Sequence, residues 1–108
     1  MTEYIVVLIT ASKEEEAANI AKEIVGAGLA GCVNIINDLR SIYRWQGKIE
    51  DENEVLMIVK TRKELFGNLV EKVKGLHSYS VPEIIALPIV EGSRDYLKWL
   101  EDETTSDI

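Results

Sequence analysis

The sequence has little of the chemistry from which disulfide-rich domains and common transition-metal sites are built. Among its 108 residues there is one cysteine, Cys32, and one histidine, His77. A single cysteine cannot form an intrachain disulfide, so the class of small secreted domains held together by disulfides is excluded. A lone histidine needs further ligands, because transition-metal sites combine several nitrogen, sulfur or oxygen donors.

Basic residues and long apolar runs are also scarce. Twelve Lys and Arg stand against nineteen Asp and Glu, giving a formal net charge of -7. Phosphate binding needs a basic face, so we expect no nucleic-acid partner. No stretch approaches the roughly 20 apolar residues of a membrane span. The first residues lack the basic segment of a signal peptide, so we expect no membrane partner and a cytoplasmic location.

Recognisable catalytic motifs are missing as well. The sequence contains no Gly-rich phosphate loop, no G-x-S-x-G and no H-E-x-x-H. We therefore predict a protein that is not an enzyme, and we expect no organic cofactor.

The most informative feature that is present is a long hairpin pattern. Two apolar and aromatic runs, Leu39–Trp45 and Lys48–Val59, flank the polar turn Gln46-Gly47. Extended back to Cys32 and on to Lys60, each arm has room for about twelve residues, or about 40 Å. A domain of this length has a radius of gyration of about 13 Å, so the hairpin is too long to be covered by its own chain. Its tip needs a partner, and a second copy of the chain is the simplest one.

The remaining pattern predicts a single α+β domain over residues 1–108. Apolar runs predict strands, stripes at helical spacing after Ser and Thr caps predict helices, and residues 102–108 are expected to form a frayed tail. The order is strand, helix, strand, strand, helix, strand, terminal helix, which is the ferredoxin-like split β-α-β arrangement with both main helices on one face. The strands are expected at Tyr4–Thr10, Cys32–Ile36, both hairpin arms and Val81–Leu87. Pro88 places the last of them on an edge of the sheet. The predicted helix caps are the capping boxes Ser12 to Glu15 and Thr61 to Glu64, and Ser93 for the terminal helix.

Five blocks in this order resemble the CutA family, small cytoplasmic proteins named for divalent-cation tolerance. The resemblance covers nearly the whole chain, from about Val6 to about Leu100. The blocks are Gly28–Asn34 (L-A-A-C-x-N), Tyr43–Ile49 (Y-W-W-x-G-K-I), Glu54–Thr61 (E-V-x-x-x-x-K-T), His77–Glu83 (H-P-Y-x-x-P-E) and Asp95–Leu100 (Y-x-x-W-L).

The resemblance implies a ferredoxin-like fold in a tight homotrimer whose hairpins wrap neighbouring subunits, similar to the PII-type signalling trimers. It also implies an association with copper and other divalent cations. Carried over position by position, the copper ligands proposed for one bacterial member fall on Ile9, Leu76 and His77. Of these three, only His77 has a side chain that can bind a metal.

The candidate metal ligands are therefore His77, Glu83 and Cys32, with Cu²⁺ or another divalent cation as the expected ion. Each has a structural alternative. His77 follows the second predicted helix, where a histidine often binds free carbonyls. Cys32 lies in an apolar strand, and free cysteine is among the residue types most often buried. Glu83 is either a solvated strand end or a partner of Lys60.

A second group of candidates would bind a small anionic ligand between subunits. Lys60, Arg62 and Tyr79 supply two cations and a phenol for such a cleft. For Lys60 the alternative is a salt bridge, with its apolar stem lying along the sheet.

The aromatic residues Tyr43, Trp45 and Trp99 are predicted to contact neighbouring subunits, because aromatic side chains are common interface anchors. The acidic run from Glu50 to Glu54 lacks the spacing and Gly of an EF-hand calcium loop. We interpret it as a solvated edge that discourages unwanted strand pairing.

Three functions are compatible with these features. The first is a homotrimer that binds a divalent cation. The second is a PII-like sensor of a small anionic ligand in the clefts between subunits. The third is a structural trimer that presents its surface to an unknown protein partner. We favour the first.

Overall fold

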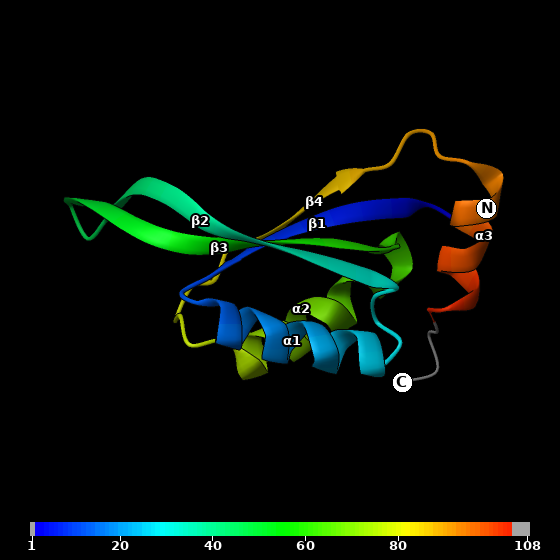
Figure 1. Ribbon diagram of the computed structural model, residues 1–108, viewed down its shortest axis with the longest axis horizontal. Helices are drawn as coiled ribbons and strands as arrows, with labels where there is room; N and C mark the ends of the chain where they lie inside the picture. The colour runs from blue at the N-terminus through cyan, green and yellow to red at the C-terminus, as the bar shows by residue number, and fades with distance from the viewer. Residues whose placement is uncertain (1, 105–108) are drawn as a thin grey trace.

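The protein has an α+β fold made of a sheet layer and a helix layer (Figure 1). Within residues 2–104, which the computed structural model describes, the elements follow the predicted order. They are β1 (Tyr4–Ala11), α1 (Glu14–Gly26), β2 (Cys32–Trp45), β3 (Lys48–Arg62), a 3-10 turn (Lys63–Leu65), α2 (Phe66–Leu76), β4 (Ile84–Pro88) and α3 (Arg94–Asp102).

The sheet has the order β2-β3-β1-β4, and every neighbouring pair is antiparallel. In Figure 1, α1 and α2 both lie under one face of this sheet. The ferredoxin-like arrangement is thereby confirmed. The strand predicted at Val81–Leu87 runs instead from Ile84 to Pro88, because Val81 belongs to the loop that follows α2. It lies on an edge, as Pro88 indicated.

The hydrophobic core lies between the sheet and the two helices. Alternate residues of β1, namely Ile5, Val7 and Ile9, point into it, as do Ile20 of α1 and Leu69 of α2. Buried residues recur at every second position of β1 and at helical spacing in α1 and α2, as the apolar pattern of the sequence predicts. Each fully buried aliphatic side chain contributes about 1.5–3 kcal/mol, so this layer holds the sheet in place.

The other face of the sheet is only partly covered. Ile36, Ile85 and Leu87 lie on it and are about half exposed, at 48%, 51% and 52%. We call this the open face. Ile36 lies on β2 and the other two lie on β4, and these are the two edge strands of the sheet, so the open face carries apolar surface at both edges.

The hairpin between β2 and β3 extends well past the helices and accounts for the long axis of 44 Å (Figure 1). Its turn is Gln46-Gly47, with φ of 52° and 79°. Two consecutive positive φ values are those of a type I′ turn, whose twist matches that of the strands. The hairpin predicted from the sequence is confirmed.

An irregularity in β2 decides which residues of the hairpin face the same side. The register changes between Ile36, opposite Leu56, and Leu39, opposite Glu54, and Asp38 takes a φ of 64°. One extra residue on β2 therefore shifts the alternation of side chains. Past this bulge the odd-numbered residues, including Tyr43, share a face with the even-numbered residues of β3.

Two of the three predicted helix caps are wrong. The α1 helix begins after Lys13, and Glu16 rather than Glu15 reaches back to the N–H and hydroxyl of Ser12. Thr61 is still in β3, where its hydroxyl donates to the Leu29 carbonyl at 2.6 Å. Ser93 caps α3 as predicted, accepting from the Tyr96 N–H. No helix in the described part of the chain is long and apolar enough to cross a membrane.

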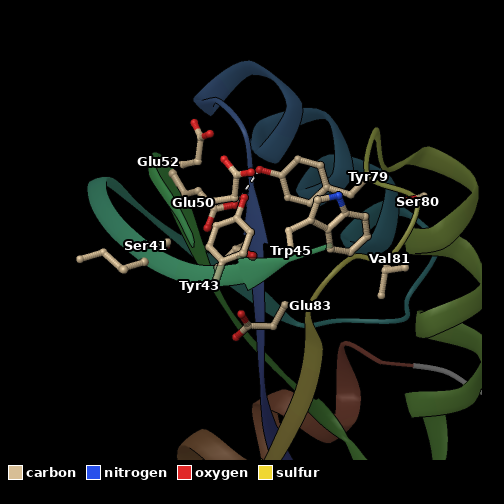
Figure 2. A pocket seen from close by; sticks show the side chains of 12 residues that line it. Ser41, Tyr43, Trp45, Glu50, Glu52, Tyr79, Ser80, Val81 and Glu83 are labelled. Carbon is tan, nitrogen blue, oxygen red and sulfur yellow. Dashed lines mark hydrogen bonds between the residues drawn. The ribbon is translucent and has the colours of Figure 1, made fainter. Parts of the chain in front are cut away.

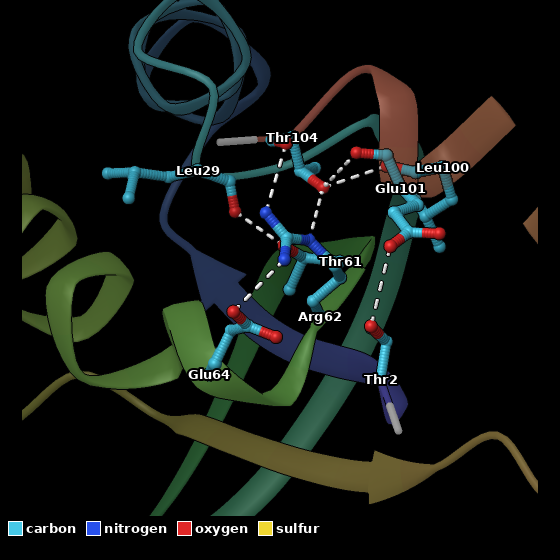
Figure 3. Close-up of polar contacts among 8 residues, drawn as sticks. All are labelled: Thr2, Leu29, Thr61, Arg62, Glu64, Leu100, Glu101 and Thr104. Carbon is cyan, nitrogen blue, oxygen red and sulfur yellow. Dashed lines mark hydrogen bonds and ion pairs between the residues drawn. The ribbon is translucent and has the colours of Figure 1, made fainter. Parts of the chain in front are cut away.

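Arg62 holds the chain that follows α3 (Figure 3). Its guanidinium donates to the Thr104 hydroxyl at 2.8 Å and to the Thr104 carbonyl at 3.0 Å, and it pairs with Glu64 at 3.1 Å. The tail predicted to fray from residue 102 is therefore held as far as Thr104, which is buried. Residues 105–108 of that predicted tail lie outside the described residues.

Candidate functional site

A pocket of about 660 Å³ lies between the hairpin and the loop that joins α2 to β4 (Figure 2). The hairpin supplies one wall, the loop supplies the other, and the end of β1 also contributes. This volume is in the range of small-molecule sites. The lining residues are Thr10, Ser41, Ile42, Tyr43, Trp45, Glu50, Glu52, Glu54, Tyr79, Ser80, Val81 and Glu83.

The pocket is acidic and contains no basic residue among those that line it. Glu50, Glu52 and Glu54 come from alternate positions of β3, so their side chains share one face. Glu83 adds a fourth carboxylate from the loop before β4. Figure 2 shows the carboxylates of Glu50, Glu52 and Glu83 together with the rings of Tyr43, Trp45 and Tyr79. The bulge in β2 is what places both hairpin aromatics on this side.

Glu54 is the most buried of the four carboxylates, with 6% of its surface exposed. Its Oε2 accepts a hydrogen bond from the Tyr79 hydroxyl at 2.6 Å. Within residues 2–104 its carboxylate has no Lys, Arg or His within ion-pair distance, and its Oε1 accepts no hydrogen bond. No buried side-chain oxygen in these residues lacks a hydrogen-bond partner, so Oε1 is accessible to solvent, and a cation bound in the pocket would supply the missing positive charge.

The two tyrosine hydroxyls of the pocket, those of Tyr79 and Tyr43, have raised pKa values. Burial raises the pKa of Tyr79, and the hydrogen bond to Glu54 and its charge raise it further. Partial desolvation raises the pKa of Tyr43, and the carboxylates of Glu52, Glu54 and Glu50 add to the effect. Both hydroxyls therefore stay protonated at neutral pH and can donate hydrogen bonds.

His77 positions the loop that carries Tyr79. Its side chain is fully buried, its Nε2 donates to the Thr10 carbonyl at 2.7 Å, and its Nδ1 accepts from the Tyr79 N–H at 3.1 Å. The tautomer with its proton on Nε2 satisfies both bonds. Its ring also lies 4.7 Å from that of Tyr79. Both nitrogens are occupied, so neither is free to bind a metal in this conformation.

The predicted metal ligands are not gathered in one place. Cys32 lies on β2 opposite Lys60, whose Nζ is 4.0 Å from its sulfur. Glu83 is exposed at the pocket, and His77 is buried outside its lining. Among residues 2–104, no three His, Cys, Asp or Glu side chains form a group that could hold a metal ion. A site built from His77, Glu83 and Cys32 remains a prediction.

Comparison with known proteins decides the family. A family model described as "CutA1 divalent ion tolerance protein" matches residues 5–103. The chain belongs to the CutA1 divalent ion tolerance protein family. A divalent-cation tolerance protein CutA from Thermus thermophilus is 56% identical over 99 residues, covering 92% of this chain and 96% of that protein.

Solved CutA1 structures have the same fold. The divalent cation tolerance protein (Cut A1) of Thermus thermophilus gives a TM-score of 0.91 at 54% identity, over 97% of this chain and 100% of that one. CutA1 from Oryza sativa gives a TM-score of 0.94 at 43% identity, over 97% of this chain and 96% of that one. The chain spans about half the length of the plant and animal CutA relatives it matches; the human protein is 44% identical over 91% of this chain and 55% of its own.

The three positions at which the CutA resemblance places copper ligands can now be located. Ile9 is fully buried in the core, and Leu76 packs against the core at the end of α2. His77 forms the two hydrogen bonds described above. In this CutA chain the three positions contribute to the hydrophobic core and to the loop, and they present no free metal-binding atom.

The residues predicted to bind an anionic ligand lie in separate regions. Lys60 donates to the Asn34 side chain on the open face. Arg62 is buried and bound to Thr104 and Glu64. Tyr79 is in the acidic pocket, next to Glu54. Within one CutA chain, the basic side chains therefore do not converge with Tyr79.

The predicted interface aromatics are all exposed to a similar degree, with Tyr43 at 41%, Trp45 at 42% and Trp99 at 41%. Trp99 lies on α3, with its ring 5.5 Å from that of Tyr96.

Sequence reasoning missed Glu50, Glu52 and Glu54 as site residues, having interpreted the acidic run as a solvated edge. The available signal was their spacing of two within a strand, which places three carboxylates on one face. Their convergence with Tyr79 depends on the loop after α2, which the spacing alone does not reveal.

Proposed function

We propose that this CutA1 family member is a non-enzymatic, cytoplasmic homotrimer that binds divalent cations, of which copper is one candidate. The binding region is the acidic pocket, and residues of a neighbouring subunit complete it. One observation carries the cation-binding role: four carboxylates line the pocket without any basic residue, and the most buried of them, Glu54, has no positive partner within residues 2–104. An anionic ligand in this pocket would meet four carboxylates and no basic side chain among the lining residues of one chain.

The shape of the chain supports the homotrimer. The hairpin tip extends away from the core with Ile42 at 64% and Ile49 at 74% exposed. The open face adds a second apolar surface on the same molecule. Two such surfaces at different places suit a ring of copies in which the hairpin of one subunit lies on the next.

Calorimetric titration of the metal-stripped protein with Cu²⁺, Zn²⁺ and Mn²⁺ tests this function. We expect saturable binding, weakened about tenfold, or about 1.4 kcal/mol, by Glu83→Gln. The matched control is Glu71→Gln, which removes the same charge from an exposed position on α2, outside the pocket. Absence of binding by all three ions, or equal weakening by both variants, would refute the cation-binding role of the pocket.

A further inference from the structure

The acidic pocket of one chain, at about 660 Å³, is much larger than a single metal ion. Metal ions require several donor atoms about 2.0–2.6 Å from one point. No such group of three His, Cys, Asp or Glu side chains is present among residues 2–104, so a metal ion in this pocket would need donor atoms from a neighbouring subunit. The pocket has the size of a small organic molecule.

The residues that line the pocket offer both negative charge and aromatic surface, and a molecule that uses both must be a cation with an apolar body. The carboxylates of Glu50, Glu52, Glu54 and Glu83 attract positive charge, and they come from two walls of the pocket, β3 and the loop before β4. Aromatic rings of Tyr43, Trp45 and Tyr79 lie among them and offer both apolar contact and cation–π attraction. A small inorganic ion uses only the first surface. A molecule with ammonium groups on an aliphatic body uses both.

We propose that this pocket binds an organic cation, an aliphatic amine or diamine, through its carboxylates and aromatic rings. This inference rests on the cation-binding role proposed above and names the chemical class of the cation. An alkyl diamine is itself divalent at neutral pH, because amines of this type have pKa values near that of lysine, about 10.4.

Glu54 is the residue expected to hold the first ammonium group. Its residue surface is more than nine-tenths buried, its Oε1 has no hydrogen-bond partner in residues 2–104, and its Oε2 is fixed by Tyr79. An ammonium group supplies three donors and the missing positive charge. The His77 ring fixes the backbone of Tyr79, so this arrangement exists before any ligand arrives.

The rest of the pocket suits the remainder of such a ligand. Tyr43 and Trp45 lie on the hairpin wall of the pocket, so their rings are available to cover the methylene groups of the ligand. Glu50 and Glu52, on the same face of β3, and Glu83, from the opposite wall, are available to a second ammonium group.

Titration calorimetry of the full chain with 1,4-diaminobutane tests the inference, with 1,4-butanediol as an uncharged control. We expect the diamine to bind and the diol not to bind. Glu54→Gln keeps the shape and the bond from Tyr79 but removes the charge, and we expect it to weaken binding at least tenfold. Glu71→Gln, which removes an equal charge outside the pocket, is expected to leave binding unchanged. Should Glu54→Gln fail to fold, Glu83→Gln, on the exposed rim, replaces it.

Aromatic contact is tested in the same samples by NMR. Transfer of magnetisation from Tyr and Trp ring protons to the methylene protons of the diamine is expected in the native protein and not in Glu54→Gln. Diamine binding that is equal in Glu54→Gln and Glu71→Gln, or that the diol reproduces, overturns the inference.

Parallel titration with the divalent metals separates this inference from the proposed function. Binding of metal without diamine overturns the organic-cation site and leaves the proposed function standing. Binding of diamine without metal supports the organic-cation site and overturns the metal part of the proposed function. Binding of neither, in a protein that light scattering shows to be a trimer, overturns both and indicates that a neighbouring subunit fills the pocket.

Discussion

The imidazole of His77 joins two backbone segments that are far apart in the sequence, the end of β1 and the loop after α2. Because the ring is fully buried, His77→Ala leaves the Thr10 carbonyl and the Tyr79 N–H without these partners and creates a cavity. We expect a loss of about 2–4 kcal/mol in the free energy of unfolding. Urea denaturation at one fixed protein concentration measures it, with Ser80→Ala in the same loop as control. An unchanged midpoint would contradict this structural role.

Glu16 gives the protein an acid-sensitive contact. Burial alone would raise the pKa of its carboxyl, but the hydrogen bonds from Ser78 and Ser12 outweigh it and hold the pKa below its ordinary value of 4.5. A lowered folded-state pKa stabilises the protein above the unfolded pKa, and this contribution is lost as pH falls through the folded value.

Glu16→Gln should therefore be less stable than the native protein at pH 7, and the difference should shrink as the pH falls below about 4.5. The reason is that a protonated Glu16 resembles glutamine. Thermal midpoints measured across the acid range give the comparison. A difference that stays constant with pH would show that the charge of Glu16 is irrelevant to stability.

At the scale of the elements, the hairpin depends on one backbone conformation at its turn. Gly47 has a φ of 79°, and a Cβ added there would meet nothing within 4 Å. Gly47→Ala should therefore cost about 1 kcal/mol through conformation alone. Gly67→Ala, also in open space but inside α2, should instead stabilise by up to about 1 kcal/mol. Thermal unfolding of both variants tests the pair, and equal signs would refute it.

The turn and the helix caps show which features could be predicted from the sequence and which could not. The Gln46-Gly47 turn was predictable because the turn type is set by the two residues themselves. The cap assigned to Thr61 was wrong because its hydroxyl is used by the Leu29 carbonyl, a partner 32 positions away. Arg62 and Thr104 were missed as a pair for the same reason. Local pattern identifies elements, while tertiary hydrogen bonds decide where they begin and end.

On the scale of the whole molecule, assembly is the main prediction. Trp45 is 42% exposed on the extended hairpin, whereas Cys32 is partly buried beside Lys60. We expect Trp45→Ala to weaken the proposed trimer more than Cys32→Ser does, because exposed aromatic residues dominate interfaces. Sedimentation velocity over a dilution series compares them. Identical profiles for the two variants, or a native mass near the monomer value of 12.1 kDa, would contradict the prediction.

The candidate site is also a property of the whole molecule, and this explains why sequence reasoning found only part of it. Tyr79 and Glu83 were both named as candidates from the sequence, but they were assigned to different ligands. Glu54 stands 25 positions before Tyr79, and their hydrogen bond depends on how α2 returns the chain to the hairpin. The residue types could be identified in advance, and the fold brought them together.

The strand order has a consequence for synthesis on the ribosome. β1 is made first, yet its partners in the sheet come much later: Ala11 pairs with Val55 and Tyr4 with Arg62, which are 44 and 58 positions further on. At about 5–20 residues per second, this central apolar strand waits several seconds for its first neighbour. The nascent chain therefore exposes an aggregation-prone segment early, and a chaperone that binds extended apolar segments would meet it before the sheet exists.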